Sequence, residues 1–344
     1  MSATAEVLAS SAARAALHPL IPVREGILEL GPLDLYHHGH LQRAGIAWRL
    51  TGPAHAPVVC ALGGISAHRH VCLTSEARSG WWHRVAGPGL PLDAARVRIL
   101  SFDYLGGSGE STGPVAGGSF PSISTRDQAQ VLLRLLDHLG VASLRAIAGG
   151  SYGGMVALAF AEAHPERVEQ LLVIGASDRA HPMSTAWRST QRSIVRLGLE
   201  SGQPAHAMQL ARALAMTTYR SAEEFAARFD SPPAQSGGRF VFPVEEYLLA
   251  RGQDYACRYL PESFLCLSES IDLHRVNAAR IFVPTTVVGF REDVLVPLAD
   301  LRAMVARLPR AHLHELSSIF GHDAFLKETD QLRSIFAATL GRDL

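Results

Sequence analysis

The stretch LRAIAGGSYGGMVALAF, residues 144–160, decides the fold expected for this chain. Its first five residues form a short run typical of a strand, and the apolar residues from Met155 onward have a helical pattern. Between them, Gly149 and Gly153 frame Ser151 as G-x-S-x-G. A side chain at either glycine would crowd a sharp turn. The stretch therefore predicts a strand, a tight turn that exposes the Ser151 hydroxyl, and a helix that starts directly after it.

A serine exposed in this way predicts a nucleophile. Its hydroxyl reacts poorly until a base removes its proton, so a carboxylate and a histidine are expected further along the chain, in that order. His322 follows the predicted strand 311–316 and precedes the last predicted helix, in a loop that can reach the turn. Asp293 follows the predicted strand 285–289 and is the preferred acid, with Glu292 as the alternative.

Acyl transfer at a serine also needs N–H donors for the oxyanion that forms at the attacked carbonyl. The N–H of Tyr152, directly after the nucleophile, is the first expected donor. The predicted strand 58–62 ends in Gly63-Gly64, so the N–H of Gly64 or of Ile65 is the expected second donor. The alternative is that the paired glycines form an ordinary turn.

The rest of the chain alternates short apolar runs with helical patterns, which predicts an α/β fold with a mostly parallel central sheet flanked by helices. Asp127 and Gly140 are the start and stop signals of the clearest helix. We expect an N-terminal arm at 1–25, a core at 26–177 and 281–344, and a helical lid inserted at 178–280. The predicted strands are 46–50, 58–62, 97–102, 144–148, 171–174, 285–289 and 311–316. The predicted helices are 125–139, 152–164 and 323–340 in the core, and 189–199, 206–216, 222–229 and 244–258 in the lid, where residues 231–238 form a loop.

Composition limits the partners. The 344 residues include 32 basic and 32 acidic side chains. The chain therefore lacks the broad positive field that attracts nucleic acids and anionic membranes. The 47% of hydrophobic residues excludes disorder for most of the chain. The four cysteines lack the spacing of a zinc site, so no metal is expected. Without a signal-like or membrane-spanning run, a cytoplasmic location is expected.

Several further segments resemble the homoserine O-acyltransferases of the α/β-hydrolase superfamily, from about residue 45 to the C-terminus. The resemblance implies the α/β-hydrolase fold with a lid, and ping-pong transfer of an acyl group from acyl-CoA through an acyl-serine to L-homoserine, a step of methionine biosynthesis. It implies acyl-CoA as co-substrate with no other cofactor, and a homodimer formed through the lid helices. The segments are 80–82 (GWW), 87–89 (GPG), 105–114 (LGGSGESTGP), 218–221 (TYRS), 293–297 (DVLVP) and 321–326 (GHDAFL).

The same resemblance assigns substrate contacts. Arg212, seven residues before Tyr219, falls where the family binds the substrate carboxylate, and Tyr219 falls within a family segment beside it. Asp323, next to His322, falls where the family meets the substrate ammonium. An arginine fork suits a carboxylate, and an acid attracts an amine.

The acyl donor is acetyl-CoA or succinyl-CoA. A succinyl group carries a free carboxylate, whose burial without a cation costs several kcal/mol, about 2–7 even for a neutral polar group. In the family that this chain resembles, the succinyl-using members have an arginine, resembling a counter-ion, two residues after the catalytic acid. This chain has Leu295 at that position. Acetyl-CoA is therefore preferred, although Arg291 is close enough in sequence to substitute.

Departures from the family leave the acceptor open to serine or another hydroxy compound. Tyr152 replaces a methionine, residues 62–64 differ from the family's oxyanion segment, and the lid is shorter. An esterase of the same fold, in which water attacks the acyl-enzyme, is the main rival. A catalytically inactive binding protein is disfavoured, because it would not need Ser151, Asp293 and His322 together.

Overall fold

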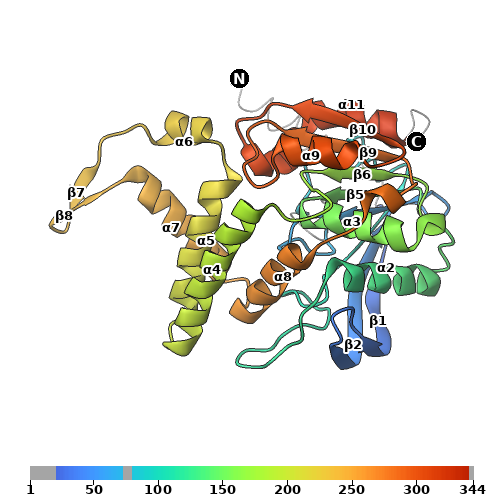
Figure 1. Ribbon diagram of the computed structural model, residues 1–344, viewed down its shortest axis with the longest axis horizontal. Helices are drawn as coiled ribbons and strands as arrows, with labels where there is room; N and C mark the ends of the chain where they lie inside the picture. Colours follow the sequence, from blue (N-terminus) through green and yellow to red (C-terminus); the bar gives the residue numbers. More distant parts are fainter. Residues whose placement is uncertain (1–20, 73–79, 341–344) are drawn as a thin grey trace, which may run out of the picture.

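The computed structural model describes residues 21–72 and 80–340, and its centre is an eight-stranded sheet (Figure 1). β2 is antiparallel to both of its neighbours, and the six strands from β4 to β10 in the sheet are parallel. The predicted mostly parallel sheet is confirmed. In the order of the sheet, the strands are β1 (Val23–Asp34), β2 (His40–Thr51), β4 (Arg98–Phe102), β3 (Val58–Leu62), β5 (Ala146–Gly150), β6 (Leu171–Ile174), β9 (Thr285–Phe290) and β10 (Ala311–Leu316).

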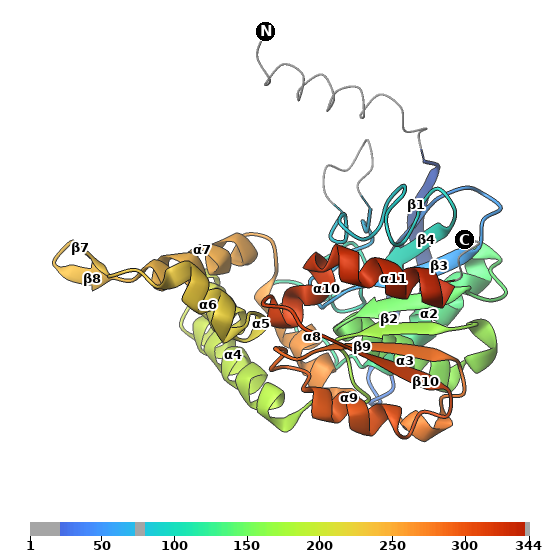
Figure 2. The same cartoon turned by 90° about the horizontal axis from the view of Figure 1, so that it is seen from above.

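Both faces of the sheet are covered, which explains why its central strands are continuously apolar. Along β3, Cys60 and Leu62 belong to one core cluster and Val59 and Ala61 to the other. The first cluster packs against α2 (Thr125–Leu139), α3 (Tyr152–Ala163) and α9 (Leu298–Val305), and the second against α11 (Thr329–Leu340). Figure 2 shows α11 on the side of the sheet opposite to α3 and α9.

Helix α2 begins and ends at the predicted signals. The Ser124 and Asp127 side chains each accept a hydrogen bond from the other residue's backbone N–H, and so form a capping box. Gly140 closes the helix with the left-handed φ of 67° that glycine adopts without strain.

A lid follows β6 and stands to one side of the sheet (Figure 1). Its helices pack on one another around Val195, Met208, Ala211, Tyr255 and Phe264, which form a small core of their own. The lid helices are α4 (Pro182–Glu200), α5 (Pro204–Tyr219), α6 (Ala222–Phe229), α7 (Pro243–Ala256) and α8 (Pro261–Leu273).

The fold differs from the sequence prediction at several places, and the helices α8 and α9 were not predicted at all. Residues 23–25 of the predicted N-terminal arm begin strand β1, while residues 1–20 lie outside the described residues. The predicted lid loop contains a hairpin of β7 (Ala234–Ser236) and β8 (Arg239–Val241), so the lid is not entirely helical. The last predicted helix is divided into η3 (Gly321–Asp323), α10 (Ala324–Lys327) and α11.

Most residues of β1 and of the hairpin are exposed, so the hydrophobic alternation that identifies a strand is weak there. The remaining elements are the short 3₁₀ helices η1 (Pro165–Arg167) and η2 (Ala278–Arg280). No helix in the described part of the chain combines the length and apolarity needed to cross a bilayer.

Candidate active site

Ser151 occupies the turn between β5 and α3 in a strained conformation. Its φ of 53° and ψ of −123° lie outside the regions that residues with side chains normally adopt. Such strain costs about 1–3 kcal/mol and persists only where the surroundings enforce it. The Ser151 N–H donates to the Ile174 carbonyl at 2.8 Å, which ties the turn to the end of β6.

The glycines around Ser151 are required by close packing. A Cβ at Gly149 would meet the carbonyl oxygen of Gly153, and a Cβ at Gly153 would meet that of Leu62. A Cβ at Gly150 would lie 2.6 Å from the Phe325 ring. The predicted crowding at Gly149 and Gly153 is confirmed, and the backbones of β3, β5 and α3 meet more closely here than any side chain allows.

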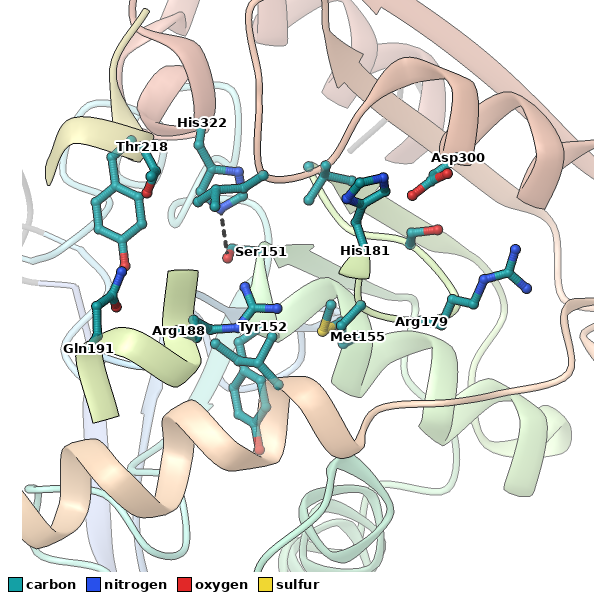
Figure 3. Close-up of a pocket in the computed structure, with 17 residues that line it drawn as sticks. Ser151, Tyr152, Met155, Arg179, His181, Arg188, Gln191, Thr218, Asp300 and His322 are labelled. Atoms are coloured by element: carbon teal, nitrogen blue, oxygen red, sulfur yellow. Dashed lines mark hydrogen bonds between the residues drawn. The ribbon is translucent and has the colours of Figure 1, made fainter. Parts of the chain in front are cut away.

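A chain of hydrogen bonds links three of the predicted residues. His322 Nε2 lies 2.9 Å from Ser151 Oγ (Figure 3), and His322 Nδ1 lies 2.7 Å from Asp293 Oδ2. The other Asp293 oxygen, Oδ1, accepts from the N–H groups of Leu295 at 2.8 Å and Val296 at 3.0 Å. The buried carboxylate is thus fixed in orientation, and it holds the imidazole with Nε2 toward Ser151.

Glu292, the alternative acid, faces away from this chain. Its carboxylate accepts from the Ser317 hydroxyl and from the Ser318 N–H, the latter at 2.7 Å. The geometry therefore places Asp293, and not Glu292, beside His322.

The pKa of His322 is raised above its ordinary value of 6.5. Burial alone would lower the pKa, because it disfavours the charged imidazolium. The negative charge and the hydrogen bond of Asp293 outweigh burial, with a further contribution from Asp323, while the positive charge of Arg188 opposes the rise. The surroundings of His322 therefore stabilise its protonated form. A general base needs this, because it must hold the proton that it takes.

The predicted oxyanion donors lie next to Ser151. Gly64 and Ile65 line one pocket with Ser151, and Tyr152 begins the helix that follows it. Within residues 21–72 and 80–340, the N–H groups of Tyr152, Gly64 and Ile65 have no hydrogen-bond acceptor. Unpaired N–H groups beside a nucleophile are available to a developing negative charge.

The loop that carries Gly64 and Ile65 is held from two sides. From the core, Gly153 N–H donates to the Gly63 carbonyl at 2.8 Å and Tyr104 Oη to the same carbonyl at 2.7 Å. From the lid, the Tyr259 hydroxyl donates to the Ser66 carbonyl at 2.8 Å, and Ser66 Oγ donates to Tyr255 Oη at 3.2 Å. Sequence reasoning missed both lid tyrosines, since nothing in their spacing relates them to residue 66.

The predicted substrate contacts lie on this same side of Ser151, in what we term the oxyanion-side pocket. Its cavity of about 170 Å³ is smaller than the 300–1,000 Å³ typical of drug-sized ligands, so it suits a small molecule. Its lining includes Gly64, Ile65, Trp81, Ser151, Arg212, Tyr219, His322 and Asp323.

Arg212 lies between two aromatic rings in this pocket. Its guanidinium carbon is 4.9 Å from the ring centre of Tyr219 and 4.6 Å from that of Tyr255. Burial lowers the pKa of Arg212, but the two tyrosines and Asp323 raise it by more, so the group stays charged. No carboxylate of the described residues lies within salt-bridge distance of it. The hydrogen-bonding edge of Arg212 is therefore available to an anionic ligand.

Asp323 is partly neutralised. Its Oδ2 lies 3.2 Å from Nε of Arg220, which also pairs with Glu224. The sequence analysis did not identify Arg220, because its proximity depends on how the end of α5 meets η3.

A second, smaller pocket also borders Ser151 and shares Tyr219, Ile271 and His322 with the first, and we term it the lid-side pocket. Leu295, the predicted acyl-specificity residue, lines it, and its carbonyl accepts from Ser184 Oγ of α4 at 2.8 Å. Arg291 is exposed and does not line it. Arg188 and Gln191 of α4 do line it (Figure 3), and sequence reasoning missed both because only the rotation of α4 turns them inward.

This strand–turn–helix junction, with its strained serine and a histidine from the loop after the last strand, defines an α/β hydrolase. A family model described as alpha/beta hydrolase fold matches residues 57–329. A solved structure of homoserine O-acetyltransferase from Bacillus anthracis superposes with a TM-score of 0.84 at 18% identity, over 93% of this chain and 98% of that one, which shows the shared fold.

Two relatives identify the family. A homoserine O-succinyltransferase of Xanthomonas campestris is 44% identical over 310 residues, 90% of this chain and 82% of the relative. A homoserine O-acetyltransferase of Thermus thermophilus is 38% identical over 285 residues, 76% of this chain and 72% of the relative. The chain belongs to the homoserine O-acyltransferases, a family of enzymes within the α/β-hydrolase superfamily, as its motifs predict.

Gly153→Ala tests the packing at the turn. The new Cβ would press on the Leu62 backbone, so we expect the free energy of unfolding to fall by at least about 2 kcal/mol in urea denaturation. Gly64→Ala is the matched control, because a Cβ there has open space around it. Equal stability of the two variants would contradict the close packing.

The pH dependence of acylation tests the environment of His322. If neutral His322 must accept a proton, the rate falls as the pH is lowered through the pKa of His322, with a midpoint above 6.5. Asp323→Asn removes a charge that raises this pKa, so its midpoint should move to lower pH. The measurement is the rate of thiol release against pH, with Asp330→Asn of α11 as control. A wild-type midpoint at or below 6.5 would contradict the assignment.

Proposed function

We propose that the protein transfers an acyl group from acyl-CoA to the hydroxyl of L-homoserine through an ester on Ser151. The observation that carries the proposal is the oxyanion-side pocket, which brings Arg212 and Asp323 to the same small cavity as Ser151 and His322. Separate positive and negative groups beside a nucleophile suit an amino-acid substrate.

In the first half-reaction, Ser151 Oγ attacks the thioester carbonyl carbon while His322 Nε2 takes the hydroxyl proton. The carbonyl oxygen becomes negative and is stabilised by the N–H groups of Tyr152 and of Gly64 or Ile65. As the carbonyl re-forms, the C–S bond breaks and His322 returns the proton to sulfur. Free CoA leaves, and the acyl group remains on Ser151. Asp293 stabilises the imidazolium throughout.

In the second half-reaction, the homoserine hydroxyl gives its proton to His322 and attacks the ester carbonyl carbon. The bond to Ser151 Oγ breaks, and His322 returns the proton to that oxygen. The product is the O-acyl amino acid, and Ser151 is regenerated. No group other than the two substrates is consumed, so acyl-CoA serves as co-substrate and no further cofactor is needed.

The acceptor is selected by charge. In our proposal the homoserine carboxylate takes the open edge of Arg212, and the ammonium takes the Asp323 oxygen that Arg220 leaves free. Binding both ends aims the side-chain hydroxyl at His322. An esterase, in which water is the acceptor, has no need for this pair of charges, so the pocket supports transfer over hydrolysis.

The relatives support two donors about equally, since one is named a succinyltransferase and the other an acetyltransferase. Leu295 favours acetyl-CoA on sequence alone. The product of either reaction is an activated homoserine ester of the kind used in methionine biosynthesis, and we place the protein there.

We also infer the homodimer through the lid that the resemblance implies. The lid carries large apolar side chains that are exposed in the single chain, and a partner chain could cover them. They include Leu197 on α4, Leu210 on α5, and Phe240 and Phe242 at and after β8.

Ser151→Ala tests the covalent route. Wild-type protein mixed with acyl-CoA alone should gain the mass of one acyl group and release about one equivalent of CoA, followed by turnover only when homoserine is added. Ser151→Ala should show neither mass gain nor burst, and turnover should fall by at least about 1,000-fold, because the nucleophile is gone. Ser193→Ala, on the exposed face of α4, is the control. Thiol release at the same rate without homoserine would identify an esterase instead.

Arg212→Met tests acceptor binding. Removing the guanidinium should raise KM for homoserine by about 100-fold, since a charged partner of the carboxylate is lost, while the acylation burst is preserved. Arg228→Met is the matched control, because Arg228 also stacks on aromatic rings, at 4.5 Å from that of Tyr247, but lies outside both pockets. An unchanged KM would refute the assignment.

A further inference from the structure

The lid-side pocket contains a cation that the sequence analysis did not foresee when it preferred acetyl-CoA as the donor. Arg188 of α4 lines this pocket with Ser151 (Figure 3). Its positive charge also acts on the His322 imidazole, where it opposes the rise in pKa. The pocket lined by Leu295 is therefore not free of positive charge, because the arginine enters from the lid instead of from the loop after Asp293.

The charge of Arg188 is only partly compensated. Its Nε and Nη2 donate to Asp272 Oδ1 at 2.9 and 2.6 Å, and Arg192 Nη1 donates to Asp272 Oδ2 at 2.6 Å. Two guanidinium groups thus share one carboxylate, which leaves one net positive charge. Asp272 fixes the orientation of Arg188, while Nη1 of Arg188 has no acceptor among the described residues.

Burial makes this excess charge costly unless a ligand meets it. The Arg188 side chain is only 12% exposed. Gln191, one turn further along the same face of α4, is 4% exposed, and its amide has no hydrogen-bond partner within residues 21–72 and 80–340. A largely buried cation whose charge is only partly compensated, next to an amide with no partner in the same cavity, suits an anionic ligand.

The rest of the pocket defines the shape of that ligand. Met155, Ile271, Leu295 and Val296 supply apolar walls beside Ser151. The cavity has about 50 Å³, room for about four water-sized groups. An acetyl group places one methyl beyond its carbonyl, whereas a succinyl group places two methylenes and a carboxylate there. The longer group matches both the space and the charge.

We propose that Arg188, aided by Gln191, binds the distal carboxylate of a succinyl group carried on Ser151, and so makes succinyl-CoA the preferred donor. The inference rests on the proposed acyl-Ser151 intermediate and names the donor it uses. The two methylenes lie against the apolar walls, and the carboxylate meets Nη1 of Arg188 and the Gln191 amide. Leu295 contributes a wall of this pocket, and Arg188 supplies the cation.

The test separates charge from length by comparing succinyl-CoA with butyryl-CoA, whose acyl chain is also four carbons long but ends in a methyl group. Thiol release is measured with homoserine present, and kcat/KM is determined for each donor. Wild-type protein should favour succinyl-CoA by at least about 100-fold, because a buried cation rejects a neutral analogue. In Arg188→Leu the preference should fall to within about threefold of unity. Arg291→Leu, the same change at an exposed arginine outside the pocket, should keep the wild-type ratio.

Equal use of the two donors by the wild type would overturn the proposal whether or not the variant folds. It would also be overturned if Arg188→Leu lowered kcat/KM for both donors by the same factor, because the guanidinium would then serve the acceptor, the CoA moiety or the packing of the lid. Failure of the proposed function has a different signature, in which no acyl-CoA gives homoserine-dependent thiol release. That result would remove the acyl-enzyme and this inference with it.

Discussion

The strained backbone of Ser151 is the constraint on which the rest of the structure depends. A positive φ at a residue with a side chain is unfavourable, and here it is accompanied by glycines at 149 and 153 that let three backbones approach too closely for any side chain to fit between them. The same close approach fixes the first turn of α3 against the end of β3. It therefore sets the Ser151 hydroxyl, the Tyr152 N–H and the loop at Gly64 relative to one another before any substrate arrives.

Sequence reasoning succeeded where one local pattern determines the outcome. The central strands were found because both of their faces are buried and their sequences are continuously apolar, and the order of Ser151, Asp293 and His322 followed from strand ends. Strand β1 and the lid hairpin were missed because most of their residues face solvent. Arg188, Gln191 and Tyr255 were missed for another reason. Which face of a lid helix looks at the site depends on how the helices pack, and spacing along one helix does not reveal it.

The charge available at the site depends on how individual side chains are paired, and not on the net charge of the chain. The chain has equal numbers of basic and acidic side chains, yet the oxyanion-side pocket and the lid-side pocket differ in how their charged side chains are paired. At the first, Arg212 lies between rings while Arg220 occupies one oxygen of Asp323. At the second, two arginines share Asp272. Such partial neutralisation holds a charged side chain in place and still leaves it able to bind, because only part of its hydrogen-bonding capacity is used.

Hydrogen bonds from two lid tyrosines to Ser66 connect the lid to the loop that carries the candidate oxyanion donors. Tyr255 and Tyr259 hold the segment that carries two of the candidate oxyanion donors, so the lid does more than cover the site. A lid that swung outward would take these anchors with it and loosen the donors at the moment that water could enter. The open form would then catalyse hydrolysis poorly, because its oxyanion donors would be out of place. A thioester would be activated only in the closed form, where the amino acid, and not bulk water, lies next to it. Protection from wasteful hydrolysis would in that case come from the assembly of the site itself, with no separate device to exclude water.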